Sequence, residues 1–185
     1  TMDGEIHRSV DGGATWALIN LDFGDRRIEL AVSPDAPRRL YAIAVATNRG
    51  LNAIWRSDND GDSWAKYYDG TLANQNLLGY PCDAGVSLPS AGQGEYDLCI
   101  AVDPNDADKV HIGGVNLWRS VNGGSIWDIT GHWSTDCSGG APNVHADQHY
   151  LGFPPGTGDL FNGNDGGVYK TTDNGDSWDW KGDGL

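Results

Sequence analysis

The sequence predicts an all-β fold made of short antiparallel sheets, and three observations support this. The 185 residues, enough for one domain of ordinary size, include 27 Gly, 8 Trp and 7 Tyr but a single Met. Glycine is typical of tight turns, and aromatic residues are typical of strands. Short segments of alternating apolar and polar residues lie between turn residues. One tryptophan-containing segment also occurs four times along the chain.

The repeated segments lie at residues 6–16, 54–64, 117–127 and 168–178, at intervals of 48, 63 and 51 residues. In each, a Ser or Thr follows an apolar strand end, and Asp or Asn, Gly and Trp stand two, four and seven places later. A repeat of this length indicates a propeller or a solenoid. We call the segments boxes one to four; their key residues are Ser9, Asp11, Gly13 and Trp16; Ser57, Asn59, Gly61 and Trp64; Ser120, Asn122, Gly124 and Trp127; and Thr171, Asp173, Gly175 and Trp178.

Each box is predicted to form the turn of a β-hairpin. The Asp or Asn side chain should accept hydrogen bonds from backbone N–H groups two or three residues on. The Gly allows the positive φ that closes such a turn. The Trp should begin the outgoing strand and cover the turn. The boxes are therefore expected to hold the sheets together, not to bind a ligand.

The strands that flank the boxes predict a partial β-propeller of four-stranded antiparallel blades. Before each of the last three boxes, an inner strand, a turn that contains Pro and a second strand follow in order. This predicts half a blade at residues 1–24 and three full blades at residues 25–94, 95–143 and 144–185. A closed ring typically has 4–8 blades. We expect the remaining blades to belong to the same chain or to another subunit.

The boxes resemble the Asp-box, or bacterial neuraminidase repeat, whose pattern is S-x-D-x-G-x-T-W. This motif occurs in β-propellers of sialidases, xyloglucanase-type glycoside hydrolases, sortilin-type receptors and secreted bacterial proteins. Boxes one and four match it well, whereas Asn59, Asn122 and Ile126 depart from it. The resemblance implies a propeller in a secreted or cell-surface protein, of bacterial origin, and leaves its activity open.

Charge and hydropathy exclude several classes of partner. The chain has 12 Lys and Arg against 26 Asp and Glu, for a formal net charge of −14. Such a surface repels phosphate backbones and anionic lipids. No stretch approaches the ~20 apolar residues that a membrane span needs. We therefore expect neither nucleic-acid binding nor membrane insertion. The only Met is Met2, after Thr1, and no signal peptide is seen, so we expect an interior or processed piece.

Two long connections between blades, residues 71–94 and 131–143, should emerge on the same propeller face. Function on propellers usually lies on such loops. Tyr80 in one connection and Trp133 in the other are candidates to stack on sugar rings, or else belong to the core of the loops.

The three cysteines have different expected roles. Cys99 lies between apolar residues of an inner strand and is expected to be a buried thiol. Cys82 and Cys137 lie in the two long connections, and we expect a disulfide between them. Such a bond would fit an oxidising extracellular or periplasmic compartment.

Polar residues interrupt the repeat in the last blade. His149 takes the place of an aliphatic residue, and Asp147 and His145 precede it by two and four positions. A strand would carry all three on one face, near Asn164 and Asp165. The cluster is a structural network, a metal site, or a ligand-facing or acid–base group. Chelation by both histidines is disfavoured, because the strand would separate their Cα atoms by roughly 13 Å.

Glycoside hydrolysis makes the acid–base interpretation concrete. It usually needs two carboxyl groups ~5 to ~9.5 Å apart, and the catalytic candidates are Asp147 and Asp165. Residues 164–169 resemble the D-x-G-G-x-Y segment of xyloglucanase-type enzymes, which carries a catalytic Asp. Asn164 stands in its place here, and an amide cannot act as a base. A sialidase is not expected, because the Arg-Ile-Pro segment of that family is absent.

No cofactor and no metal site is expected, and calcium is the one ion that a motif suggests. Asp58–Asp62 resembles the start of a calcium loop, but it lacks the spacing and the Glu of an EF-hand. Its place inside box two explains it without metal.

Three functions therefore remain. The first is an extracellular module that recognises or scaffolds a carbohydrate or protein ligand, through His145, His149, Asn164, Tyr80 and Trp133. The second is a glycoside hydrolase whose cleft is shared with missing blades. The third is a structural repeat of a long surface or filament protein.

Overall fold

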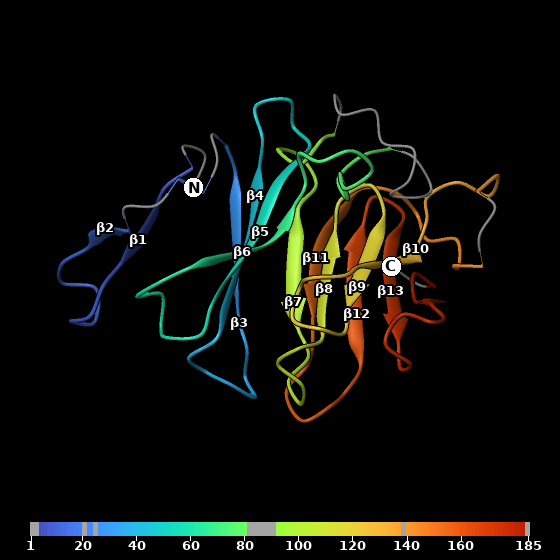
Figure 1. Cartoon of the computed structure of the whole chain (residues 1–185). Helices are drawn as coiled ribbons and strands as arrows, with labels where there is room; N and C mark the ends of the chain where they lie inside the picture. The colour runs from blue at the N-terminus through green and yellow to red at the C-terminus, as the bar shows by residue number, and fades with distance from the viewer. Residues whose placement is uncertain (1–3, 20–21, 24–25, 81–91, 138–139, 184–185) are drawn as a thin grey trace.

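The computed structural model describes residues 4–19, 22–23, 26–80, 92–137 and 140–183. In this part of the chain, all regular secondary structure is β-strand. The strands form one sheet of two strands and three sheets of four strands, all antiparallel. In Figure 1 the two-stranded sheet lies on the left and the first full sheet beside it, while the other two full sheets overlap on the right of the view. The described residues contain no helix long and apolar enough to cross a membrane.

Every full sheet is a meander, in which each strand pairs with the next in sequence. The first, two-stranded sheet contains β1 (Ile6–Arg8) and β2 (Ala17–Ile19). The three full sheets contain β3 (Ile28–Val32), β4 (Leu40–Val45), β5 (Leu51–Ser57) and β6 (Ala65–Asp69); β7 (Cys99–Val102), β8 (Val110–Gly113), β9 (Leu117–Ser120) and β10 (Asp128–Gly131); and β11 (Gln148–Gly152), β12 (Leu160–Asn164), β13 (Gly167–Thr171) and β14 (Asp179–Trp180).

The first strands of successive full sheets lie next to each other, β3 against β7 and β7 against β11. The later strands of each sheet lie farther from these contacts, so the sheets are arranged radially, as blades around a propeller axis. This confirms the predicted fold class of three full blades and half a blade. The predicted order of strands within each blade is also observed.

A separate apolar cluster fills each space between neighbouring sheets. Ile6, Phe23 and Ile28 are buried between the half blade and the first full sheet. Tyr41 and Trp118 belong to the largest cluster, between the first and second full sheets. The third cluster joins the last two sheets. Burial between blades, not within one blade, therefore provides the hydrophobic stabilisation.

All four boxes form turns with one hydrogen-bond pattern. In box two, Ser57 Oγ accepts from the N–H groups of Asn59 and Gly61, at 3.3 and 2.9 Å. Asn59 Oδ1 accepts from the N–H of Ser63, at 3.0 Å. The equivalent bonds occur in the other three boxes. The Asp or Asn thus reaches the N–H four places on in every box, because the hydroxyl already accepts from the N–H two places on. In box three, Asn122 Oδ1 also accepts from the N–H of Ser125, three places on, as predicted.

The box glycines require a left-handed backbone. Gly61 has φ 82°, and Asp60 before it also has positive φ, at 61°. Gly124 in box three, with φ 91°, lies against side chains of Tyr41 and Ile54 in the preceding sheet. Boxes two to four are therefore each both a turn and a contact with the previous blade.

Candidate functional site

One end of the blades carries the polar residues of interest. Because the strands are antiparallel, the starts of β3, β7 and β11 lie at the same end as the turns β4–β5, β8–β9 and β12–β13. The connections that lead from β6 to β7 and from β10 to β11 also end here. We call this the loop face. The boxes lie at the opposite end.

His149, Asp165 and Tyr96 form one hydrogen-bonded group on the loop face. His149 Nε2 lies 2.9 Å from Asp165 Oδ1, and the Tyr96 hydroxyl donates to Asp165 Oδ2 at 3.1 Å. The rings of Tyr96 and His149 meet edge to face, 4.9 Å between centroids. Hydrogen bonds from His149 and Tyr96 lower the pKa of Asp165, which favours the carboxylate. All three side chains are exposed enough to meet a ligand.

A second polar group joins Asp147 to the start of β7. Gln93 Nε2 donates to Asp147 Oδ1 at 2.5 Å and to Asp97 Oδ2 at 3.2 Å. Asp147 has φ 66°, a left-handed conformation that is uncommon for a residue other than Gly. Strained residues of this kind cluster at functional sites.

Asp97 is a buried carboxyl group. Only 1% of the residue is exposed, and its Oδ1 has no hydrogen-bond partner. Burial, and then the charge of Asp147, raise the pKa of Asp97 to about 7, although the Gln93 hydrogen bond opposes the shift. Such shifts mark candidate functional sites.

The structure corrects the prediction that His145, Asp147 and His149 share one strand face. The strand β11 begins only at Gln148, and the left-handed Asp147 breaks the alternation before it. The pairing with β12 also shifts register between Gln148 and Tyr150. As a result, Asp147 contacts Gln93 and His149 contacts Asp165.

The other two residues of the predicted cluster lie close to the β12–β13 turn. The His145 ring lies against Gly166, where a Cβ would collide with it. Asn164 Nδ2 donates to Gln148 Oε1 and Asn162 Oδ1, and its Oδ1 accepts from the N–H of Gly166. Asn164 thus holds the turn that presents Asp165. In the part of the chain that the structure describes, no group of three or more His, Cys, Asp or Glu is placed to hold a metal ion.

The two long connections meet. Trp133 Nε1 donates to the carbonyl of Tyr80 at 2.8 Å, and both side chains are exposed. Cys99 is a buried free thiol, as predicted. Cys137 is disulfide-bonded. Cys82 lies outside the described residues, so its pairing with Cys137 stays a prediction.

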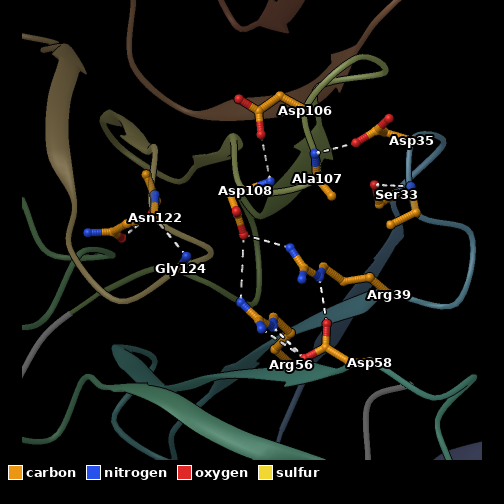
Figure 2. A network of polar contacts seen from close by, with 12 residues as sticks. Ser33, Asp35, Arg39, Arg56, Asp58, Asp106, Ala107, Asp108, Asn122 and Gly124 are labelled. Carbon is orange, nitrogen blue, oxygen red and sulfur yellow. Dashed lines mark hydrogen bonds and ion pairs between the residues drawn. The ribbon is translucent and has the colours of Figure 1, made fainter.

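At the opposite end, the acidic segment of box two is neutralised by arginines. Arg39 and Arg56 converge on Asp58, and both also reach Asp108 in the next sheet (Figure 2). Asp60 pairs with Arg38 at 2.8 Å and Asp62 with Arg8 at 2.6 Å. The charges that suggested calcium therefore have partners within the protein.

Sequence reasoning missed Tyr96, Asp97 and Gln93. All three lie in the segment that leads into the inner strand β7, as Asp147 does before β11 in the next blade. A polar residue directly before the first aliphatic residue of an inner strand was the available signal. Aligning blades by their apolar residues alone concealed it.

Comparisons with known proteins support the fold only. No protein-family model and no curated protein matches the chain. An ancestral GH74 enzyme has a similar fold, with a TM-score of 0.61 and 16% identity over 96% of this chain and 21% of its own. YCF48 from Cyanidioschyzon merolae has a TM-score of 0.55 and 16% sequence identity, over 96% of this chain and 49% of its own. A GH74 enzyme of Niastella koreensis has a TM-score of 0.52 and 19% sequence identity, over 81% of this chain and 22% of its own.

These proteins are β-propellers, in agreement with the radial sheets described above. The chain spans between about a fifth and a half of their lengths.

Proposed function

We propose that the chain is part of a β-propeller that binds carbohydrate on its loop face, at Tyr96, His149 and Asp165. The observation that carries this is the exposed hydrogen-bonded group that these residues form across two blades. Aromatic rings offer apolar faces to sugar rings, while a carboxylate and an imidazole accept and donate hydrogen bonds to hydroxyl groups. The hydrogen bonds among the three side chains fix their relative positions, which lowers the ordering cost of binding.

A panel of soluble glycans, measured by calorimetry, tests this proposal. Tyr96→Ala and Asp165→Asn should each weaken binding at least tenfold. Tyr150→Ala is the matched control, because Tyr150 is also exposed on β11 but lines a separate pocket with Phe153 and Phe161. Binding that survives both site variants would contradict the assignment. Binding of peptides but no glycan would favour a protein ligand instead.

A glycoside hydrolase is the second candidate, favoured by the raised pKa of the buried Asp97, which is joined to Asp147 through Gln93. Both carboxyl groups accept from the same Gln93 nitrogen, so this amide occupies the space between them that a glycosidase pair leaves for the sugar. Hydrolysis would therefore need a further carboxyl group, from Asp165 or from other blades. Release of reducing sugar that is lost in Asp147→Asn or Asp165→Asn would establish this function. The absence of any ligand, with tolerance of all these variants, would favour a structural repeat.

A secreted or cell-surface location also belongs to this proposal. It is supported by the disulfide at Cys137, because such bonds persist in oxidising compartments. Peptide mapping before and after reduction should show Cys82 and Cys137 joined, with a gain of two hydrogens on reduction. Two free thiols at these positions would contradict it.

A further inference from the structure

Two carboxyl groups from different blades meet at the loop face with one amide between them. Asp97 precedes β7 and Asp147 precedes β11, and Gln93 Nε2 donates to both. The two N–H groups of the Gln93 amide thus serve one oxygen of each carboxyl group, Asp97 Oδ2 and Asp147 Oδ1. Asp97 Oδ1 remains buried and without a partner. A polar atom in that position is costly unless a proton or a ligand satisfies it.

Basic side chains nearby are committed elsewhere. Arg27 on β3 donates to Glu29 and to the carbonyl groups of Glu95, Tyr96 and Leu98. Arg26 pairs with Glu95. Among the described residues, neither Asp97 nor Asp147 takes part in an ion pair. Two ionised carboxylates here would face each other without a counter-charge.

We propose that Asp97 and Asp147 share one proton and act as a pH-operated contact between the last two blades. With the proton bound, one carboxyl donates to the other, and the Gln93 amide is hydrogen-bonded to both. When the proton leaves, two negative charges oppose each other, and that of Asp97 is buried away from water. The contact weakens, and the loop face gains one negative charge. The contact between Asp97 and Asp147 does not depend on the proposed carbohydrate binding. Any effect of pH on ligand binding does rest on that proposed function.

The other charged and titratable groups around Asp97 do not replace this proton. β3 contributes Arg27 and Glu29, which pair with each other. β7 contributes Cys99, whose pKa burial raises, so the thiol stays neutral. β8 contributes Gly113 and Gly114 at this end, which carry no charge.

The remaining titratable groups near Asp97 lie in the segments around the starts of β7 and β11. The pKa of Tyr96 is raised, first by its hydrogen bond to Asp165, so its hydroxyl also stays neutral. The segment before β7 contributes Glu95, which pairs with Arg26 and Arg49. The segment at β11 contributes His149, which pairs with Asp165, and His145, which bonds to the Ala146 carbonyl.

The direction of the pH effect follows from the raised pKa of Asp97. Between about pH 4 and pH 7, the unfolded chain releases this proton, since the ordinary value is 3.8, while the folded protein keeps it. The folded state binds more protons in that window, so its stability falls as pH rises. Asp97→Asn carries a neutral group of the same shape, and this part of the pH dependence should disappear.

Urea unfolding of the protein and of Asp97→Asn, from pH 5 to pH 8, tests this. The two proteins should have similar urea midpoints at pH 5, and Asp97→Asn should have the higher midpoint at pH 8. Asp58→Asn is the control, because Asp58 is an arginine-paired carboxylate and its loss should destabilise at both pH values. A constant difference between the protein and Asp97→Asn across this range would overturn the proposal.

Carbon-13 NMR of the Asp carboxyl groups separates sharing from simple burial. One carboxyl should titrate near neutral pH, and Asp147→Asn should move that midpoint downward, because the opposing charge is gone. An unchanged midpoint in Asp147→Asn would overturn sharing. Recovery of the pH 8 midpoint by calcium in the native protein, but not in Asp97→Asn, would also overturn it, in favour of a bound cation. If this titration is observed but no glycan binds at any pH, only the proposed function fails.

Discussion

Arg119 on β9 holds the box of the next blade through two hydrogen bonds from its Nη1, to Asp176 Oδ1 and to the carbonyl of Asn174, both at 2.8 Å. Arg8 makes the same pair of contacts to Asp62 and to the carbonyl of Asp60. The arginine that precedes one box thus binds the acidic residue five places after the Ser or Thr of the next.

The contact between the first and second full blades departs from this rule. Ser125 stands where the acidic residue would be in box three. Arg56 turns instead to Asp58 of its own blade and Asp108 of the next (Figure 2). The contact between neighbouring blades is kept with a different carboxylate.

Arg119→Ala should destabilise the fold by about 1 kcal/mol, since a charge-assisted bond to a partly exposed partner is lost. The unfolding midpoint in urea measures this. Lys181→Ala is the control, because its 3.5 Å pair with Asp179 is exposed and should contribute little. Equal effects of the two variants would show that Arg119 does not join the blades.

Ser120→Ala should destabilise by roughly 1–2 kcal/mol, because Ser120 Oγ accepts from two N–H groups inside a buried turn. Thermal unfolding measures the loss. Ser125→Ala, in the exposed part of the same box, should change little. A neutral Ser120→Ala would mean that water replaces the hydroxyl as acceptor.

His111 should make the protein sensitive to acid. Burial, and then the charges of Arg119 and Lys109, lower its pKa to about 3. The unfolded chain binds a proton below about pH 6.5 while the folded protein does not, so stability falls as pH falls from 6.5 toward 3. The loss should reach a few kcal/mol, since each pKa unit corresponds to about 1.4 kcal/mol.

His111→Phe should flatten this acid slope while keeping the ring that packs against Phe153. Urea unfolding at pH 4 and pH 6.5 gives the comparison. Asp97 makes stability fall as pH rises between about pH 4 and pH 7, which is opposite to the effect of His111. The quantity to measure is therefore the difference in stability between the protein and His111→Phe at each pH. Parallel slopes would show that His111 is protonated in the folded state.

Asp165→Asn should lower the phenol pKa of Tyr96. The hydrogen bond to the carboxylate, and its charge, now raise that pKa because ionisation would place two negative charges together. Carbon-13 NMR of the tyrosine ring carbon next to oxygen measures the change. The pKa of Tyr68 is raised to about 12 by burial alone and should stay constant. An unchanged Tyr96 titration would show that the contact does not form in solution.

Features that depend on a few neighbouring residues were predictable. The box turn needs a hydroxyl, an acidic or amide side chain and a Gly within five residues, so Ser57, Asn59 and Gly61 predict it without knowledge of the rest. Alternation of apolar and polar residues along a strand is also a local feature, so it predicts where the successive strands of each blade lie. The face shared by His145, Asp147 and His149 was not predictable, because one left-handed residue breaks the alternation and no local pattern announces it.

The four-fold repeat was therefore sufficient to identify the sheets, their turns and their place in a propeller. The polar groups of the loop face were decided by packing between blades. Asp97 and Asp147 are 50 positions apart, and Tyr96 and Asp165 are 69 apart, so only the angle and spacing of adjacent sheets bring them together. Burial then sets the charge of Asp97, because a carboxyl group that ionises freely on an open strand retains its proton where water is excluded.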